Sequence, residues 1–415
     1  MKSKYLALAL AGLMLAGGCR ATDNTDTVTP TAEEPVATVA AEPTEEAGPT
    51  EEAEPTQEAE ATPTEAEEEH ETGIKDVFAE HNMKAGTCLT AWDLRNPLVM
   101  DIVSTNFNSI TCGNEMKPDY TLNQKKSQEE GHVVVEYGQD TINILEWCKE
   151  NGMAMRGHTL VWYSQTPEWL FHENFDSSQP LVGREELLTR MEDLIRGNFE
   201  ELERLGYLDM FYAYDVINEG WMEDGKPRQC HWSEIIGDDY FWHAFYFADQ
   251  YAPETVDLYY NDYNEQFKAD TLAEFAATLV DEDGRSLIDG IGLQAHLYTS
   301  DDMEQYFDAI DTLAATGLKL QVTELDVCLG KWQYPDEKNE DTLKEQGRFY
   351  YDLINGIFER VDDGRVEMDA FTFWGTADST SWRREYNPML FDGAFKPKYA
   401  YYGAIQDREN AGFDE

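Results

Sequence analysis

The sequence has 415 residues, of which 83 are Asp or Glu and 31 are Lys or Arg, so its formal net charge is −52. This excess of negative charge repels nucleic acid and anionic membrane surfaces. We therefore expect no nucleic-acid partner.

The first 18 residues predict a signal for export. Lys2 and Lys4 precede an apolar run, Tyr5–Leu15, that is too short to span a bilayer in the mature protein. The run leads through Ala-Gly-Gly to Cys19 and resembles a bacterial lipoprotein signal, although Leu15 lies four residues before the Cys instead of three. We expect a lipid on Cys19 as the only membrane contact; an ordinary secretory signal cleaved nearby is the alternative. Either way the protein is expected to be exported, as a bacterial cell-surface lipoprotein or a secreted protein.

An acidic segment rich in Thr, Pro and Glu covers residues 19–72. Residues 21–72 hold 17 acidic side chains and six prolines but no Lys, Arg, Phe, Tyr or Trp. Because such a segment buries too little apolar surface to offset the entropy of ordering, we expect a disordered linker. Residues 73–415 carry 66 acidic and 28 basic side chains, which leaves −38, but they are rich in Trp and Tyr. We expect them to form one folded domain.

From residue 83 onward, short β-branched or aromatic runs alternate with amphipathic stretches. This α/β pattern is typical of a parallel sheet covered by helices, and eight such units fit a closed (β/α)8 TIM barrel. The alternative, a doubly wound open sheet, is disfavoured because no Gly-x-Gly-x-x-Gly motif follows the first run. The predicted strands are Met83–Leu89, Phe107–Thr111, Ala154–Val161, Phe211–Ile217, Val256–Tyr260, Ile288–Ala295, Leu318–Thr323 and Met368–Phe373. The predicted helices are Gly138–Glu150, Arg184–Leu205, Asp239–Gln250, Ala269–Val280, Met303–Ala315 and Thr342–Arg360.

Polar and aromatic side chains gather at the carboxyl ends of seven of these eight strands. Barrel enzymes build their active sites on that face, from the ends of several strands. The residues concerned are Asn114, Lys117, His158, Trp162, Asn218, Glu219, Asn261, Gln294, His296, Glu324, Asp326 and Trp374.

Glu219 and Glu324 follow the apolar ends of the fourth and seventh predicted strands. A carboxylate in such a place is costly unless it is paired or functional. Two carboxyl groups facing each other across a barrel mouth are what a glycosidase needs, and a retaining enzyme holds them about 5–5.5 Å apart. We interpret Glu219 as the general acid/base and Glu324 as the nucleophile; structural ion pairs are the alternative.

The neighbouring residues favour the site. Asn218 could hydrogen-bond a sugar 2-hydroxyl, and His296 could lie between Glu324 and Asp326 and orient the nucleophile. Aromatic rings stack on the C–H faces of sugars. We assign that role to Trp162, Trp374 and Trp382, and core packing to Trp221, Trp232, Trp242 and Trp332. The five cysteines after Cys19 show no metal-ligand spacing and are expected to be buried free thiols.

Several blocks in order resemble glycoside hydrolase family 10, the retaining endo-β-1,4-xylanases, over roughly residues 75–407. The likeness implies that Lys117, His158, Trp162, Asn218, His296 and Trp374 surround the sugar next to the cleaved bond, while Asn114 and Gln165 contact the next sugar on the non-reducing side. It also implies that Gln294 hydrogen-bonds the acid/base and that Trp382 crowds the place of a hexose hydroxymethyl group. The blocks are Phe107–Thr111 with Asn114–Lys117, Arg156–Trp162, Asp215–Glu219, Gly290–His296, Val322–Asp326, and Phe373–Gly375 with Trp382.

The resemblance implies an endo-1,4-β-xylanase that acts on xylan and xylo-oligosaccharides. We expect a monomer, and we expect no cofactor and no metal, because the sequence has no HExxH motif and no Cys/His ligand spacing. Four positions depart from the family pattern: Gly113 where Glu is frequent, Pro118 and Tyr214 where Trp is usual, and Tyr163 where His is common. The first two put the second non-reducing-side sugar site in doubt. The alternatives are a retaining β-glucanase of similar fold and a non-catalytic surface lipoprotein that binds glycans.

Overall fold

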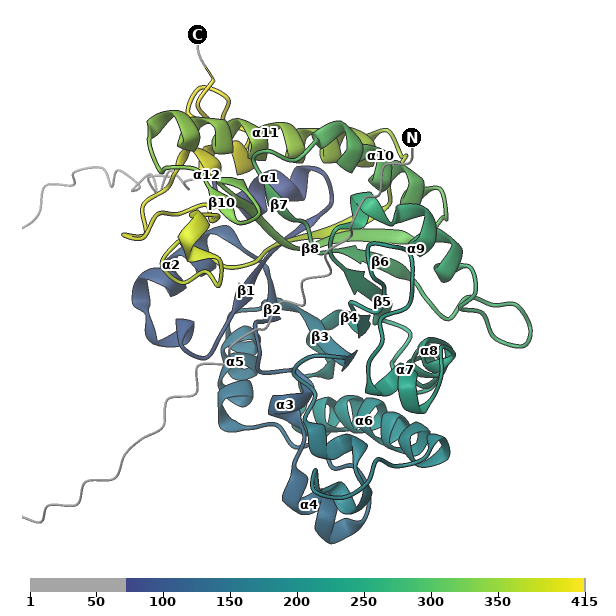
Figure 1. Ribbon diagram of the computed structural model, residues 1–415. Coiled ribbons are helices and arrows are strands. Elements are labelled where there is room, and N and C mark those ends of the chain that lie inside the picture. Colours follow the sequence, from purple (N-terminus) through teal and green to yellow (C-terminus); the bar gives the residue numbers. More distant parts are fainter. Residues whose placement is uncertain (1–71, 414–415) are drawn as a thin grey trace, which may run out of the picture. The chain divides into compact units, whose positions relative to one another are not determined.

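A computed structural model describes residues 72–413 (Figure 1). The predicted signal, Cys19 and the predicted linker as far as residue 71 lie outside the described residues. Within residues 72–413, no helix is long and apolar enough to cross a membrane.

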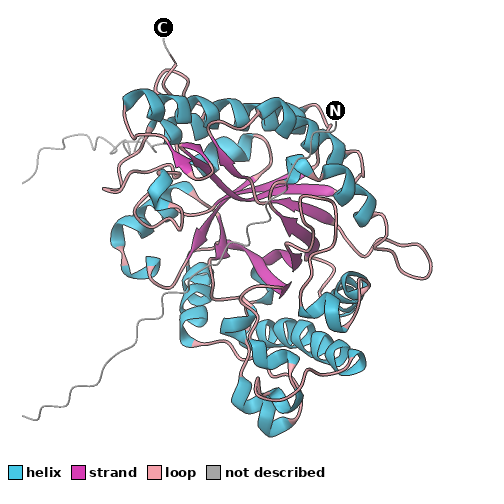
Figure 2. Ribbon diagram, in the orientation of Figure 1, coloured by secondary structure: helices cyan, strands magenta, loops and turns pink. Residues whose placement is uncertain are grey.

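Eight parallel strands close into a barrel at the centre of the domain, and helices surround it (Figure 2). Neighbouring strands follow the order β11-β1-β2-β3-β4-β5-β6-β8, and pairing of β11 with β8 closes the ring. The prediction of a TIM barrel is therefore confirmed. The barrel strands are β1 Lys84–Leu89, β2 Ser109–Cys112, β3 Ala154–Trp162, β4 Phe211–Asn218, β5 Asp257–Asp262, β6 Gly290–Leu293, β8 Lys319–Cys328 and β11 Met368–Phe373.

The helices begin and end at the signals that their sequences carry. Asn339 caps α11 by accepting a hydrogen bond from the amide of Thr342, and α6 ends at Gly206, whose φ of +76° suits a residue without a side chain. The helices are α1 Ile74–Glu80, α2 Pro97–Asn106, α3 Pro118–Thr121, α4 Gln124–Glu130, α5 Gln139–Glu150, α6 Arg184–Leu205, α7 His231–Ile235, α8 Tyr240–Tyr251, α9 Ala269–Ala276, α10 Met303–Ala314, α11 Glu340–Asp362 and α12 Tyr399–Ala404.

Most strand bounds differ from the prediction by one or two residues, and the differences in two strands change where site residues lie. The sixth does not run through Ala295, because that residue has φ +57° and interrupts the strand after Leu293. His296 instead begins a short strand, β7 His296–Tyr298, which pairs with the distal part of β8. The seventh strand is longer than predicted, so Glu324 lies inside β8 and not after it.

The barrel interior beneath the mouth contains a buried ion pair. The guanidinium of Arg156 in β3 bonds both carboxylate oxygens of Asp215 in β4, and both side chains are almost fully buried. Arg156 Nε also donates to Gln321 of β8 at 2.9 Å. These charge-assisted bonds satisfy the buried charges and connect opposite sides of the barrel below the catalytic face.

Candidate active site

Glu219 comes directly after β4 and is positioned by its backbone. Its N–H donates to Asn261 O at 2.9 Å, and its C=O accepts from Arg228 Nε at 2.7 Å. The next two amide groups both donate to the hydroxyl of Tyr260, at 2.9 and 3.0 Å. Glu219 has φ +57°, a conformation that is unfavourable for a residue with a side chain. These hydrogen bonds hold the conformation and thereby direct the carboxyl group.

Glu324 is buried in β8, with 5% of its surface exposed. Its Oε1 accepts a hydrogen bond from Asn261 Nδ2 at 2.8 Å, and its Oε2 lies 3.4 Å from His296 Nε2. The other imidazole nitrogen of His296 lies 3.1 Å from Asp326 Oδ1. His296 thus lies between two carboxylates of β8, in the position expected from the sequence.

A chain of side-chain amides connects the two glutamates. Asn261 Nδ2 reaches Glu324, as described, and also donates to Asn218 Oδ1 at 2.9 Å. Asn218 Nδ2 in turn donates to Glu219 Oε1 at 3.2 Å, and Gln294 Nε2 donates to the same oxygen at 3.2 Å. The carboxyl groups of β4 and β8 therefore belong to one hydrogen-bonded network.

The surroundings drive the pKa values of the two carboxyl groups apart. Burial is the largest influence that raises the pKa of Glu219, and the negative charges of Asp262 and Glu324 raise it further. Burial also opposes ionisation of Glu324, but the hydrogen bond from His296 and nearby positive charges outweigh it and lower its pKa to about 2. One carboxyl group is therefore favoured as an acid and the other as a carboxylate, as acid and nucleophile require.

The surroundings of His296 favour its positively charged form. Burial lowers its pKa, but Asp326 and Glu324 outweigh burial and raise that pKa to about 9. Asp326 is held by Arg383 Nη1 at 2.6 Å and by Trp382 Nε1 at 3.0 Å. The ring of Trp382 lies 5.1 Å from the imidazole of His296 and is 62% exposed, so it is free to contact a ligand above the network.

Three further predicted residues form a polar cluster in the segments after β2 and β3. Lys117 Nζ donates to Gln165 Oε1 at 2.9 Å and to Asn114 Oδ1 at 3.3 Å, and Gln165 Nε2 donates to Asn114 Oδ1 at 3.1 Å. Lys117 Nζ also lies 5.0 Å from the ring centre of Trp162. Burial lowers the pKa of Lys117.

The remaining predicted residues are two tryptophans and the histidine between them. The ring of His158 lies 5.5 Å from that of Trp374 and 6.3 Å from that of Trp162. His158 Nδ1 lies 2.9 Å from the buried carboxylate of Asp215, which fixes the ring. Trp162 pairs with Asn218 in the register of β3 and β4. The structure thus brings every predicted site residue to the barrel mouth, apart from Cys19.

The sequence matches a known family over almost the whole domain. Residues 73–407 correspond to glycosyl hydrolase family 10. The chain belongs to glycosyl hydrolase family 10. The matched residues include all predicted site residues other than Cys19.

Relatives within the family are endo-1,4-beta-xylanases. Endo-1,4-beta-xylanase B of Butyrivibrio fibrisolvens is 34% identical over 340 residues, which cover 79% of this chain and 52% of that protein. The bifunctional endo-1,4-beta-xylanase XylA of Ruminococcus flavefaciens is 36% identical over 340 residues, which cover 79% of this chain and 33% of that protein. The chain thus spans about half the length of the first relative and a third of the second.

Solved structures of the family share the barrel. The N-terminal modules of endo-1,4-beta-D-xylanase 10B from Clostridium thermocellum, complexed with xylohexaose, superpose with a TM-score of 0.73 at 30% identity, covering 83% of this chain and 69% of that one. The endo-1,4-beta-xylanase of Caldicellulosiruptor owensensis gives a TM-score of 0.68 at 31% identity, covering 80% of this chain and 99% of that one.

The family departures at Gly113 and Pro118 lie beside the cluster of Asn114, Lys117 and Gln165. A Cβ at Gly113 would lie 2.8 Å from the side chain of Thr90, so a larger residue there requires its neighbours to shift. Pro118 is the first residue of α3, where its missing N–H costs nothing. Both departures leave the hydrogen bonds of the cluster intact.

The other two departures have different surroundings. Tyr214 is fully buried, and its ring occupies space against Gly157, where a Cβ would lie 2.3 Å from it. Tyr163 is 42% exposed at the mouth, with its ring 4.2 Å from the guanidinium of Arg228. Since Arg228 also bonds the backbone of Glu219, Tyr163 belongs to the surroundings of the predicted acid/base, whereas Tyr214 is a core residue.

Three residues join the site that the sequence alone did not assign to it. Asn261 was noticed as a strand end, but only the structure shows that it bonds both Glu324 and Asn218. It fits because position 292 is Gly: a Cβ there would lie 2.5 Å from Asn261 Oδ1. Arg228 and Arg383 lie in irregular segments, where no periodic pattern marks a functional residue.

The tryptophans assigned to core packing do not all lie in the core. Trp232 is buried, and Trp221 and Trp242 are partly buried against the core. Trp332 is 66% exposed, so that prediction was wrong. Trp332 lies in the turn of a hairpin between β9 Gly330–Lys331 and β10 Tyr334–Pro335, where its ring is not covered.

Exposed aromatic side chains gather on the face that carries the site. Eight aromatic residues are exposed among residues 72–413, and seven of them lie between the end of a barrel strand and the next major helix. Since those segments follow the carboxyl ends of the strands, the exposed rings belong to the same face of the barrel as the predicted site. The seven are Trp92, Tyr120, Tyr163, Phe267, Trp332, Tyr334 and Trp382; the eighth, Tyr246, lies on α8.

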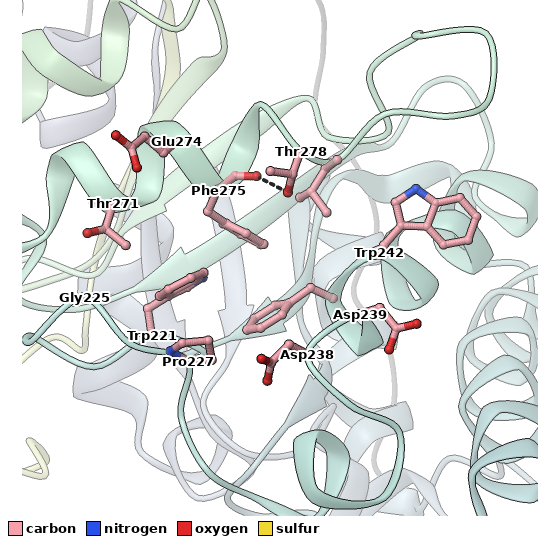
Figure 3. Close-up of a pocket in the computed structure, with 12 residues that line it drawn as sticks. Trp221, Gly225, Pro227, Asp238, Asp239, Trp242, Thr271, Glu274, Phe275 and Thr278 are labelled. Atoms are coloured by element: carbon pink, nitrogen blue, oxygen red, sulfur yellow. Dashed lines mark hydrogen bonds between the residues drawn. The ribbon is translucent and has the colours of Figure 1, made fainter.

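A separate cavity of about 580 Å³ lies between α8, α9 and the segment after Glu219 (Figure 3). Rings of Trp221, Phe241 and Phe275 line it, with Asp238 and Glu274 among its acidic side chains. None of the predicted site residues contributes to this lining. The cavity is therefore distinct from the predicted active site.

Proposed function

We propose that this protein is an endo-1,4-β-xylanase that hydrolyses internal bonds of xylan and xylo-oligosaccharides with retention of configuration. The observation that carries the proposal is the pair Glu219 and Glu324, joined by amides, with the pKa of Glu219 raised and the pKa of Glu324 lowered. Membership of family 10 and the relatives named as xylanases support it. The complex of the Clostridium thermocellum relative with xylohexaose supports the same class of ligand.

In the first step, protonated Glu219 donates its proton to the glycosidic oxygen while the carboxylate of Glu324 attacks the anomeric carbon. The bond between that carbon and the oxygen breaks, and the reducing-end part of the chain leaves as an alcohol. Asn218 is placed to hydrogen-bond the sugar next to the cleaved bond. His296 and Asn261 hold the Glu324 carboxylate in position for attack.

In the second step, water attacks the glycosyl ester of Glu324, and Glu219 accepts the proton of that water. The ester carries no negative charge, so one of the influences that raises the pKa of Glu219 is removed. Glu219 can then act as a base in the same site where it acted as an acid.

The test is release of reducing sugar from xylan, with Glu324→Ala as the matched control. We expect release by the natural protein and none by the variant. Preferential release from β-glucan would favour the glucanase alternative. Binding of xylan without release by the natural protein would favour the non-catalytic glycan-binding alternative.

We also propose that the protein is exported as a monomer and tethered by a lipid on Cys19. The basic start, the apolar run and the cysteine that follows it support this proposal. Labelling with a fatty acid, followed by separation of membrane and soluble fractions, tests the tether. Cys19→Ser should lose the label and become soluble; a labelled variant, or an unlabelled natural protein, would contradict the proposal.

A further inference from the structure

The short segment between β6 and β7 contacts both of the proposed catalytic glutamates. Gln294 Nε2 donates to Glu219 Oε1 at 3.2 Å, and His296 Nε2 lies 3.4 Å from Glu324 Oε2. Ala295 between them has φ +57°, a conformation that is unfavourable for a residue with a side chain. Because this conformation separates β6 from β7, it determines where the side chains on either side of it lie.

Glu265 fixes the backbone of Ala295 from the segment that follows β5. Its side chain is buried, and its Oε1 accepts a hydrogen bond from the Ala295 N–H at 3.2 Å. Two further hydrogen bonds of the segment between β6 and β7 join backbone groups: Gln294 N–H donates to Asp262 O at 2.9 Å, and Asp326 N–H donates to Ala295 O at 3.4 Å. Among the described residues, Glu265 is thus the only side chain that bonds the backbone of this segment.

The carboxyl group of Glu265 is incompletely paired. Its Oε2 is buried and has no hydrogen-bond partner within residues 72–413, and the same holds for the hydroxyl of Tyr306 on α10. The ionisable groups that face it are Asp262, Lys268 and Tyr306. Burial outweighs the positive charge of Lys268 and raises the pKa of Glu265 to about 7. Below that pH the neutral carboxyl group is favoured, and it still offers Oε1 to the amide of Ala295.

We propose that Glu265 is a positioning residue, which holds Ala295 so that Gln294 reaches the acid/base and His296 reaches the nucleophile. The proposal rests on the proposed xylanase function. Burying a carboxyl group with an unpaired oxygen lowers stability, and an apolar side chain would fill the same space without that cost. What the carboxyl group provides is a fixed backbone conformation on which the surroundings of both glutamates depend.

The test compares Glu265→Gln with Glu265→Met in the hydrolysis of xylohexaose. Both side chains are neutral and similar in length, but only Gln offers an amide oxygen to Ala295. We expect Glu265→Gln to retain most of the natural kcat. In Glu265→Met we expect kcat to fall about 10-fold, the usual weight of a lost buried hydrogen bond, with little change in KM. Circular dichroism at the assay temperature shows whether each variant is folded.

The pH profile distinguishes positioning from a general loss of stability. Displacement of Gln294 removes a hydrogen bond that lowers the pKa of Glu219, and displacement of His296 removes one that lowers the pKa of Glu324. Both limbs of the profile of kcat/KM should therefore move upward in Glu265→Met, by about half a unit or more, and should stay in place in Glu265→Gln. A lower rate with unmoved limbs, or equal losses in the two variants, would overturn the proposal.

The substitution Ala295→Gly provides a second test. Glycine adopts a positive φ without strain, so this backbone should depend less on the bond from Glu265. Added to Glu265→Met, Ala295→Gly should restore part of the lost rate, and no recovery would contradict the proposal. If Glu265→Met does not fold alone, it is compared with Glu265→Gln in the Ala295→Gly background, where its limbs should still lie higher.

Failure of the proposed function is a different result. If the natural protein releases no sugar from xylohexaose, the proposed xylanase function fails. If the natural protein is active and the Gln and Met variants behave alike, only the positioning role of Glu265 fails.

Discussion

Replacement of His296 by Gln tests how the site keeps Glu324 ionised. Gln retains a polar side chain at this position but removes the positive charge between Glu324 and Asp326. His296 provides the hydrogen bond that does most to lower the pKa of Glu324 against the effect of burial. We therefore expect the pKa of Glu324 to rise in the variant.

The expected size follows from the pKa of Glu324, which lies at about 2 instead of 4.5. That difference corresponds to about 3 kcal/mol of preferential stabilisation of the carboxylate. Since two of the four influences that lower this pKa come from His296, its hydrogen bond being the largest, the pKa should rise by about one unit in the variant. The acidic limb of the profile of kcat/KM against pH should move upward by the same amount.

The assay is hydrolysis of xylohexaose, whose leaving group needs protonation, between pH 2 and pH 9, with circular dichroism to exclude unfolding at each pH. The alkaline limb, which reflects Glu219, should stay in place. An acidic limb that remains near the natural value, with only the rate reduced, would refute the assignment of His296 to the ionisation of Glu324.

The same contact links stability to pH with a definite sign. The pKa of Glu324 is lowered, so its contribution to the free energy of unfolding is fully present above pH 4.5 and is lost as the pH falls toward 2. The pKa of His296 is raised, so its contribution to the free energy of unfolding is fully present below pH 6.5 and is lost as the pH rises through about 9. Both contributions come from the interaction between Glu324 and His296, which is fully present between pH 4.5 and pH 6.5. The melting temperature of His296→Gln should therefore fall furthest below that of the natural protein in this pH range.

The remaining predictions concern the catalytic pair and the selectivity for xylose. Glu219→Ala should reduce the rate on xylan by roughly 10²- to 10⁴-fold. The rate of the glycosylation step should fall much less on a substrate with an activated aryl leaving group, because such a group needs no acid. Equal losses on both substrates would exclude the acid role. Proton NMR of the first product should show retention, as expected for carboxyl groups about 5–5.5 Å apart; an inverted product would exclude Glu324 as nucleophile. Trp382→Ala should relax discrimination against glucose-based substrates in competition assays, because the indole no longer crowds a hydroxymethyl group; an unchanged preference would remove Trp382 from the selectivity argument.

Much of this architecture could be predicted because it depends on local patterns. The alternation of buried strands with amphipathic helices is a property of neighbouring residues, and it places the ends of parallel strands on one face. Glu219 and Glu324 could be assigned because each follows or interrupts an apolar strand, where an ionisable side chain is costly. Family motifs then assigned roles to their neighbours.

Other features depend on contacts between distant parts of the sequence, which form only in the folded protein. Trp332 was assigned to the core because core packing is the usual role of a single Trp, but burial depends on whether a neighbouring element covers the ring, and Trp332 is 66% exposed. The strand break at Ala295 turns His296 onto β7, beside Asp326 of β8. A backbone conformation of this kind is stabilised by tertiary hydrogen bonds, so no periodic pattern in the sequence predicts it.

The sequence by itself determined the barrel, the face that carries the chemistry and the two glutamates, since these follow from residue type and spacing along the chain. Only the tertiary structure decided how the glutamates differ. The pKa of each depends on groups from other strands: Asp262 beside Glu219, and His296 beside Glu324. Likewise, Asn261 joins the pair only because closure of the barrel brings β4, β5 and β8 within hydrogen-bonding distance.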